Sequence, residues 1–237
     1  MVTSSAEPRA KATIVPRPLR TPRSAAVAGI LFSVLFTTGL VLVRTAMPAD
    51  PADAGAWLSD ASQRRAVLLA LGLVPFAGIA FLWFIAVVRD RVGDAEDRFF
   101  ATVFLGSGLL FVAMLFAAAA IAAGLVSSAG DDGRRLVESD TWEVGRDATY
   151  TLLNVYAMRM AGVFTIAAST ILRRTATGPL WLAVTGYVIA VVLLVTAGFL
   201  PWIELLFPAW VFALSLHILV ASFRRDRGER STARHKD

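Results

Sequence analysis

The chain contains no cysteine and only two histidines among its 237 residues. Without cysteine it has no disulfide bonds, thiolate nucleophiles, cysteine-ligated zinc or iron–sulfur clusters. Only His217 lies within a hydrophobic run, so a haem held by two histidines between membrane helices is excluded. The sequence also lacks the zincin and Walker motifs. We therefore expect no catalytic residues, no cofactor and no metal site.

Hydrophobic residues make up 57% of the chain, against about 45–50% in a typical soluble domain. The excess is gathered in long runs, which is typical of membrane-spanning helices. The net charge is +5, but the basic residues flank the hydrophobic runs. They therefore indicate orientation in a membrane and not binding to nucleic acid. The sequence predicts an all-α, polytopic membrane protein whose first partner is the lipid bilayer.

Six hydrophobic segments are predicted to cross the membrane. The predicted spans cover residues 25–43, 66–88, 99–126, 148–172, 180–200 and 202–223. A signal peptide is the rival interpretation of the first run, but its apolar part would have only about 7–15 residues. Gly198 and Pro201 supply a turn in the last long run, which is too long for one crossing. A six-helix membrane domain over 24–223 is thus flanked by a disordered, proline-rich basic tail over 1–23 and a basic tail over 224–237.

The distribution of Lys and Arg predicts that both ends of the chain are cytoplasmic. The two tails, the 89–98 loop and the turn with Arg173 and Arg174 hold 16 basic residues, against 6 on the other side. In multi-spanning proteins the cytoplasmic loops carry the excess of Lys and Arg. We expect a multi-pass protein of a bacterial plasma membrane. The acidic 127–147 loop is expected to be a solvated turn or short helix with Trp142 near the headgroups; a cation or partner site is the alternative.

Two predicted spans carry stripes of small residues, which let helices approach closely in a membrane. Each stripe repeats every four residues and so lies on one helix face. The stripes are Ala25, Gly29, Ser33 and Thr37 in the first span, and Ala157, Ala161, Thr165 and Ser169 in the fourth. We expect packing seams within the chain, or between copies in a homo-oligomer, or against a partner membrane protein. Gly106 and Gly108 are expected to be close-packing positions, and Pro75 is expected to kink the second span.

Arg159 lies about ten residues inside the fourth predicted span, hence near mid-membrane. A charge there costs roughly 2.5–3.5 kcal/mol to insert, so we expect an internal partner or a water-filled cavity. Tyr156 shares its helix face, with Asn154 farther round. Glu204, at the outer start of the sixth span, is the carboxylate expected to pair with Arg159, directly or through water. Such a pair either fixes the helix register or takes part in anion binding or proton or ion coupling.

Two further groups of polar residues allow a structural and a functional interpretation. His217, in the cytoplasmic half of the sixth span, is expected to hydrogen-bond to a neighbouring helix; a proton relay is the alternative. In the loop after the second span, Asp90, Asp94 and Asp97 have a spacing that would suit Mg²⁺ with a phosphate substrate. Asp94 and Arg98 also form a favourable i,i+4 pair, so we expect a self-neutralising loop.

Two stretches resemble uncharacterised multi-spanning membrane proteins of high-GC actinobacteria. They are 97–116 (DRFFATVFLGSGLLFVAMLF) and 153–170 (LNVYAMRMAGVFTIAAST). The resemblance extends over most of 25–223 and implies a polytopic membrane protein, but it brings no activity with it.

Three classes of function therefore stand. The first is a non-enzymatic membrane component that binds a partner, assists assembly or senses a signal, and the short outer loops favour it. The second is a small transporter or channel subunit built around Arg159. The third is a membrane enzyme acting on lipid through the carboxylates of the 89–98 loop.

Overall fold

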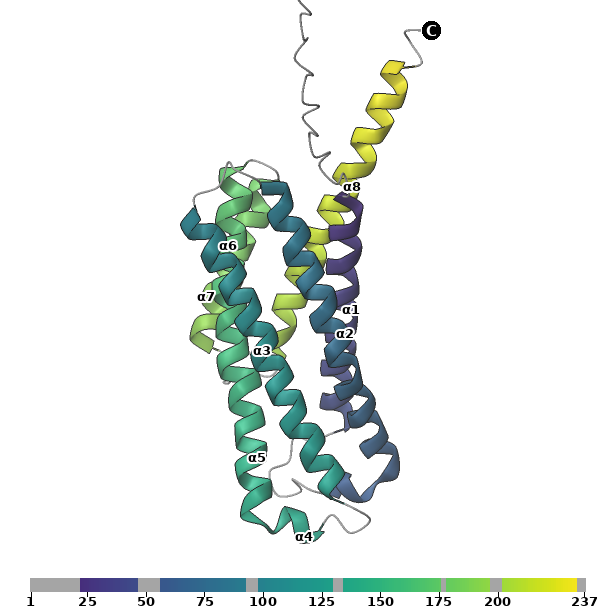
Figure 1. Cartoon of the computed structure of the whole chain (residues 1–237), viewed down its shortest axis with the longest axis vertical. Coiled ribbons are helices and arrows are strands. Elements are labelled where there is room, and N and C mark those ends of the chain that lie inside the picture. The colour runs from purple at the N-terminus through teal and green to yellow at the C-terminus, as the bar shows by residue number, and fades with distance from the viewer. Residues whose placement is uncertain are drawn as a thin grey trace, which may run out of the picture.

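The structure, a computed structural model, describes residues 22–46, 56–92, 98–129, 134–175, 178–196 and 202–233. These residues form an elongated bundle of antiparallel helices, and no strand occurs among them (Figure 1). The expected all-α class is confirmed. The main helices are α1 (Pro22–Ala46), α2 (Ala61–Val92), α3 (Arg98–Ser128), α5 (Asp140–Tyr150), α6 (Met158–Arg174), α7 (Leu180–Thr196) and α8 (Leu206–Ala233). The short elements are η2 (Ala56–Ser59), α4 (Arg134–Val137), the π-helical η4 (Thr151–Ala157) and η5 (Ile203–Leu205).

In the part of the chain that the structure describes, five helical stretches are long and apolar enough to cross a membrane. They are Ser24–Thr45, Ala61–Arg89, Phe99–Ser128, Asp140–Arg174 and Ile203–Arg224. The sixth apolar helix, α7, has 17 residues and is therefore about 25 Å long. It packs against α6 and contacts α8.

Several helices extend beyond their predicted bounds. The fourth predicted span began at 148, but α5 starts at Asp140 and continues through η4 into α6. Likewise α8 continues past the predicted end of the sixth span to Ala233. Pro75 lies inside α2.

Some sequence-based predictions lie outside the described residues. They are the basic tail up to residue 21, the turn at Gly198 and Pro201, Asp94, Asp97 and the side chain of Asp90.

A cluster of phenylalanine rings fills the bundle between α1, α2, α3, α6 and α8. Phe81 is at its centre, with ring centroids of Phe32 at 4.6 Å, Phe164 at 5.0 Å and Phe111 at 5.2 Å. Phe207, at the start of α8, packs edge-on against Phe111 at 5.0 Å. All five rings are fully buried. This half of the bundle is thus a close-packed apolar core.

Both small-residue stripes are packing seams within the chain. On α1, Gly29 lies so close to α8 and α2 that an added Cβ would clash with the hydroxyl of Ser215 and come within 2.8 Å of the Phe84 ring. On the second seam, Ser169 of α6 faces Gly186 of α7 in the same way. Six of the eight stripe residues show no exposed surface or very little, and Gly29 is also buried. The expected close approach of helices is therefore confirmed, with the partner helices supplied by this chain.

A second, smaller hydrophobic cluster lies where α2, α3 and α5 extend beyond the ends of α7 and α8 (Figure 1). We call this region the distal lobe; its buried residues are Trp57, Leu58, Val67, Val126, Ala129 and Trp142. The rings of Trp57 and Trp142 are 6.3 Å apart. Ser139 begins α5, and its hydroxyl accepts the backbone N–H of Trp142 at 3.4 Å. The predicted 127–147 loop thus holds a helix whose tryptophan is buried in protein.

Candidate functional site

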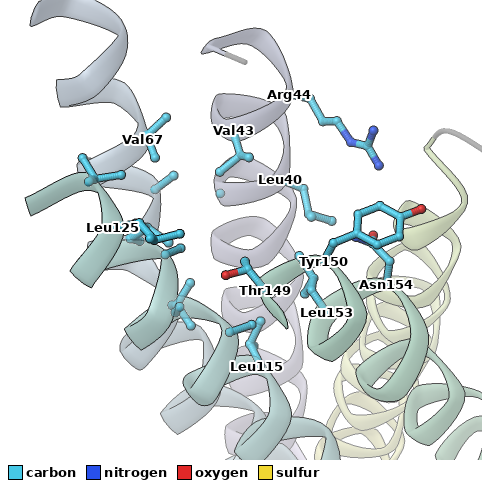
Figure 2. A pocket seen from close by; sticks show the side chains of 18 of the residues that line it. Leu40, Val43, Arg44, Val67, Leu115, Leu125, Thr149, Tyr150, Leu153 and Asn154 are labelled. Carbon is cyan, nitrogen blue, oxygen red and sulfur yellow. The ribbon is translucent and has the colours of Figure 1, made fainter. Parts of the chain in front are cut away.

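A cavity of about 450 Å³ lies between the phenylalanine core and the distal lobe (Figure 2). It is partly open to the outside of the molecule. Its walls come from α1, α2, α3, α5 and η4, and most of its lining is aliphatic or aromatic. The volume falls within the range of roughly 300–1,000 Å³ that is usual for small-molecule sites. This is the candidate functional site.

The cavity exists because side chains become smaller along three neighbouring helices at the same level. Large rings fill the core, and small residues take their place toward the distal lobe. The change runs from Phe32 and Phe36 to Gly39 on α1, from Phe81 to Ala77 and Ala70 on α2, and from Phe104 and Phe111 to Ala118 and Ala122 on α3. A void lined by small apolar residues forfeits dispersion contacts unless a ligand fills it.

Two polar groups that line the cavity have no partner in the described part of the chain. Asn154, on the π-helical η4, is only 7% exposed and makes no side-chain hydrogen bond there. The indole N–H of Trp57 is also buried without a partner, and the residue is 3% exposed. Leaving a buried polar group unsatisfied costs about 1–3 kcal/mol. The amide of Asn154 is open to a ligand in the cavity, whereas the Trp57 N–H has almost no accessible surface and cannot reach one. Single π-helical turns are frequent at functional sites.

Arg44 lies at the rim of the cavity, near the end of α1. Its Nη2 donates a hydrogen bond to Glu204 Oε1 at 3.0 Å, and this ion pair joins α1 to η5. The Glu204 side chain is 4% exposed and that of Arg44 is 38% exposed. The neighbouring Trp202, also in the lining, has a φ of 69°. A bulky residue in the left-handed region is strained, and such strain is found where the surroundings hold a side chain in place.

The predicted pair between Arg159 and Glu204 is wrong as a direct contact, because Glu204 is bound to Arg44. Arg159 is exposed on the outside of the bundle, makes no ion pair within the described residues, and does not line the cavity. Its position along the bundle can be read from the neighbouring helix. Gly162, one turn away, lies against Leu194 near the end of α7, so Arg159 is level with the end of that helix.

The other predicted polar residues are not brought together either. Tyr156 is 51% exposed on the outer surface of η4. His217 is half-buried on α8 and makes no hydrogen bond within the described residues, so its expected bond to a neighbouring helix is not found. It lies thirteen positions after Glu204, about 20 Å along the helix. Of the five candidates, only Asn154 lines the cavity.

Sequence reasoning missed Arg44, Trp57 and the cavity itself. Arg44 ends a hydrophobic run and counts there only as a flanking charge. Trp57 lies between two predicted spans, where nothing in the sequence indicates burial. The change from Phe to Ala and Gly is visible in the sequence, but it aligns only once the antiparallel order of the helices is known.

Comparison with known proteins gives no further guide to the site: no family model, no curated protein and no solved structure matches this chain.

Proposed function

We propose that this is a non-enzymatic integral membrane protein that binds one acyl chain of a membrane lipid in the cavity beside the distal lobe. The proposal rests on the cavity of about 450 Å³, which is lined mainly by apolar residues of α1, α2, α3, α5 and η4 and is partly open to the outside. The proposal belongs to the first of the three classes of function that the sequence left open.

The proposal includes six membrane crossings with both ends in the cytoplasm of a bacterium. The first turn of α1 and the last turns of α8 lie at the same end of the bundle (Figure 1). Arg89, Arg98, Arg174 and Arg224 flank the apolar stretches at that end, as expected for a cytoplasmic side. The distal lobe then faces the outside, and α7 makes the sixth crossing with its about 25 Å.

In this orientation the cavity runs along the outer part of α1, from Leu35 to Arg44. That stretch is about 14 Å long, which is close to half the hydrocarbon thickness of about 30 Å. An apolar cavity at this depth is more favourably filled by a lipid chain than by water, because its walls offer water few hydrogen bonds. The observations therefore support a chain of the outer leaflet as the occupant.

The geometry gives less support to the two other classes of function. A transporter built on Arg159 would need a polar path to that residue, and the described half of the bundle beyond the cavity is filled with phenylalanine rings. A lipid enzyme using the 89–98 loop would act at the opposite end of the bundle, since the cavity is lined on α3 only from Leu115 onward.

The test is tryptophan quenching by phosphatidylcholine with a brominated chain, added to the protein in detergent. Trp83 and Trp181 are exposed on the outside and are replaced by Phe in all samples to lower the background. Trp57, Trp142 and Trp202, which line the cavity, should then be quenched in a saturable manner, with about one lipid bound per protein. No saturable quenching would overturn the proposal.

A variant that fills the cavity, compared with a matched variant elsewhere, tests where the lipid chain binds. A Cβ on Gly39 would meet only the Ala70 carbonyl at 3.6 Å, so Gly39→Leu places a side chain in the cavity without a clash at Cβ. Gly72→Leu makes the same change on α2, where nothing lies within 4 Å and no cavity is present. Quenching should be lost in Gly39→Leu and kept in Gly72→Leu. Equal quenching in the two variants would place the chain elsewhere.

A further inference from the structure

We infer that the lipid held in the cavity is an anionic phospholipid, whose phosphate is bound by Arg44 and Arg146. This inference rests on the proposed function and adds the class of headgroup. The observation behind it is the sign and the hydrogen-bonding character of the polar groups in the lining. Both charged residues that line the cavity are arginines, Arg44 from α1 and Arg146 from α5. Each has a carboxylate partner outside the lining: Glu204 lies 3.0 Å from Arg44, and Asp147 lies 3.4 Å from Arg146.

The hydrogen-bond donors of the cavity fit the same headgroup. Both guanidinium groups can only donate hydrogen bonds. Asn154 adds an amide with two N–H donors and no present partner in the described part of the chain. A site made mainly of donors is complementary to an acceptor-rich, negatively charged group, and Arg binds phosphate especially well because of its planar set of donors.

Arg44 is held in place for this role. One of its five N–H donors is engaged by Glu204 at 3.0 Å, which leaves the others available. Figure 2 shows the Arg44 guanidinium directed from α1 toward the side of the cavity where Tyr150 and Asn154 project. Glu204 thus acts as a positioning residue, and the buried charge of Glu204 keeps Arg44 from turning away into solvent.

The polar groups also lie at the end of the cavity that suits a lipid of the outer leaflet. The deep wall, toward the phenylalanine core, is apolar and includes Leu35, Phe36 and Leu115. The two charged donors, Arg44 and Arg146, lie toward the end of α1 and the distal lobe. A lipid of the outer leaflet has the same polarity, with its chain directed inward and its phosphate outward.

The experiment compares brominated phosphatidylglycerol with brominated phosphatidylcholine in the quenching assay described above. The wild type should bind phosphatidylglycerol about tenfold more tightly, as expected for one or two hydrogen bonds to a charged group. Arg146→Gln changes an exposed residue. It should weaken phosphatidylglycerol binding several-fold and phosphatidylcholine binding less, because the choline ammonium already offsets the phosphate charge of that lipid. The double variant Arg44→Gln with Glu204→Gln removes both charges of the ion pair, so that no buried charge is left alone, and should have the same effect.

Arg159→Gln is the control, since it removes a positive charge outside the cavity. It should keep the full preference for phosphatidylglycerol. An equal loss in Arg159→Gln, or equal affinity of the wild type for the two lipids, would overturn the inference. Brominated oleate is the third probe: saturable quenching by oleate without any by phosphatidylglycerol would also overturn it, in favour of a free fatty acid. If no probe gives saturable quenching, the proposed function itself fails, so the two failures are distinguishable.

Discussion

Arg44 and Glu204, which are far apart in the sequence, form an ion pair in which Arg44 Nη2 lies 3.0 Å from Glu204 Oε1. The pair connects α1, the first helix, to η5, the turn that leads into the last helix. Since α1 and α8 pack along each other, the pair fixes their relative register at the rim of the cavity. It takes the structural role that the sequence suggested for a pair with Arg159.

Replacing one partner of this ion pair should destabilise the protein more than replacing both. Glu204→Gln or Arg44→Gln alone should cost about 1–3 kcal/mol, below the 3–5 kcal/mol of a fully buried pair because the Arg44 side chain is partly screened by solvent. The double variant should be more stable than the sum of the single losses predicts. Thermal unfolding in detergent measures all three. Strictly additive losses would show that the two side chains do not interact.

Arg159→Ala should leave thermal stability in detergent within about 0.5 kcal/mol of the wild type. The side chain is exposed, and no ion pair holds it within the described residues. Tyr156→Ala, another exposed residue nearby, is a suitable comparison. A loss from Arg159→Ala as large as that from Glu204→Gln would mean that Arg159 has a partner the described residues do not supply.

The close helix packing at the small-residue stripe of α1 leads to a prediction about Gly29. Gly29→Ala should destabilise the protein by about 1–3 kcal/mol through overpacking, because the new methyl group meets the Ser215 hydroxyl and the rigid Phe84 ring. Gly106→Ala is the control on α3, where nothing lies within 4 Å, and it should be neutral or stabilise by up to about 1 kcal/mol through helix propensity. Unfolding of both variants in the same detergent decides the matter; a harmless Gly29→Ala would contradict the packing described here.

Local sequence patterns were sufficient to predict the two helix contacts at the small-residue stripes. A stripe of small residues repeating every four positions predicts a close helix contact by itself, and the seams at Gly29 and Ser169 confirm it. For a single glycine the argument is weaker. Gly108 is closely packed against Ile85 and Phe164, whereas Gly106 faces open space, so the expected close packing of Gly106 is wrong. Nothing in the sequence around two neighbouring glycines tells which one faces a helix.

The helix that carries Arg159 begins earlier than the sequence predicts. The helix is continuous from Asp140 to Arg174, but its first part, α5, is polar, so hydropathy does not mark its start. The sequence counts the position of Arg159 from the first apolar residues near 148, whereas in the structure Arg159 is level with the end of α7, one turn from the contact of Gly162 with Leu194. Hydropathy thus predicts that a segment is apolar, but the depth of a residue depends on the neighbours against which the helix packs.

A last prediction concerns the start of α2, outside the apolar stretches. Asp60 precedes α2, and its Oδ1 accepts hydrogen bonds from the Ser62 hydroxyl at 2.6 Å and the Ser62 backbone N–H at 2.7 Å. These bonds, the side-chain one first, lower the pKa of Asp60 below its ordinary value of 3.8. The unfolded chain therefore binds the proton more readily than the folded chain. The resulting stability is fully present above the unfolded pKa and is lost as the pH falls through the folded pKa.

Asp60→Asn separates this effect from the titration of other carboxylates. Asn caps a helix about as well as Asp but carries no titratable group, so α2 should keep its start. Thermal stability in detergent, measured from about pH 6 down to about pH 3, should fall less steeply in the variant than in the wild type. Because every other acidic residue is shared, the difference between the two curves belongs to Asp60 alone. Parallel curves would mean that the Asp60 carboxylate is not bonded to Ser62 in solution.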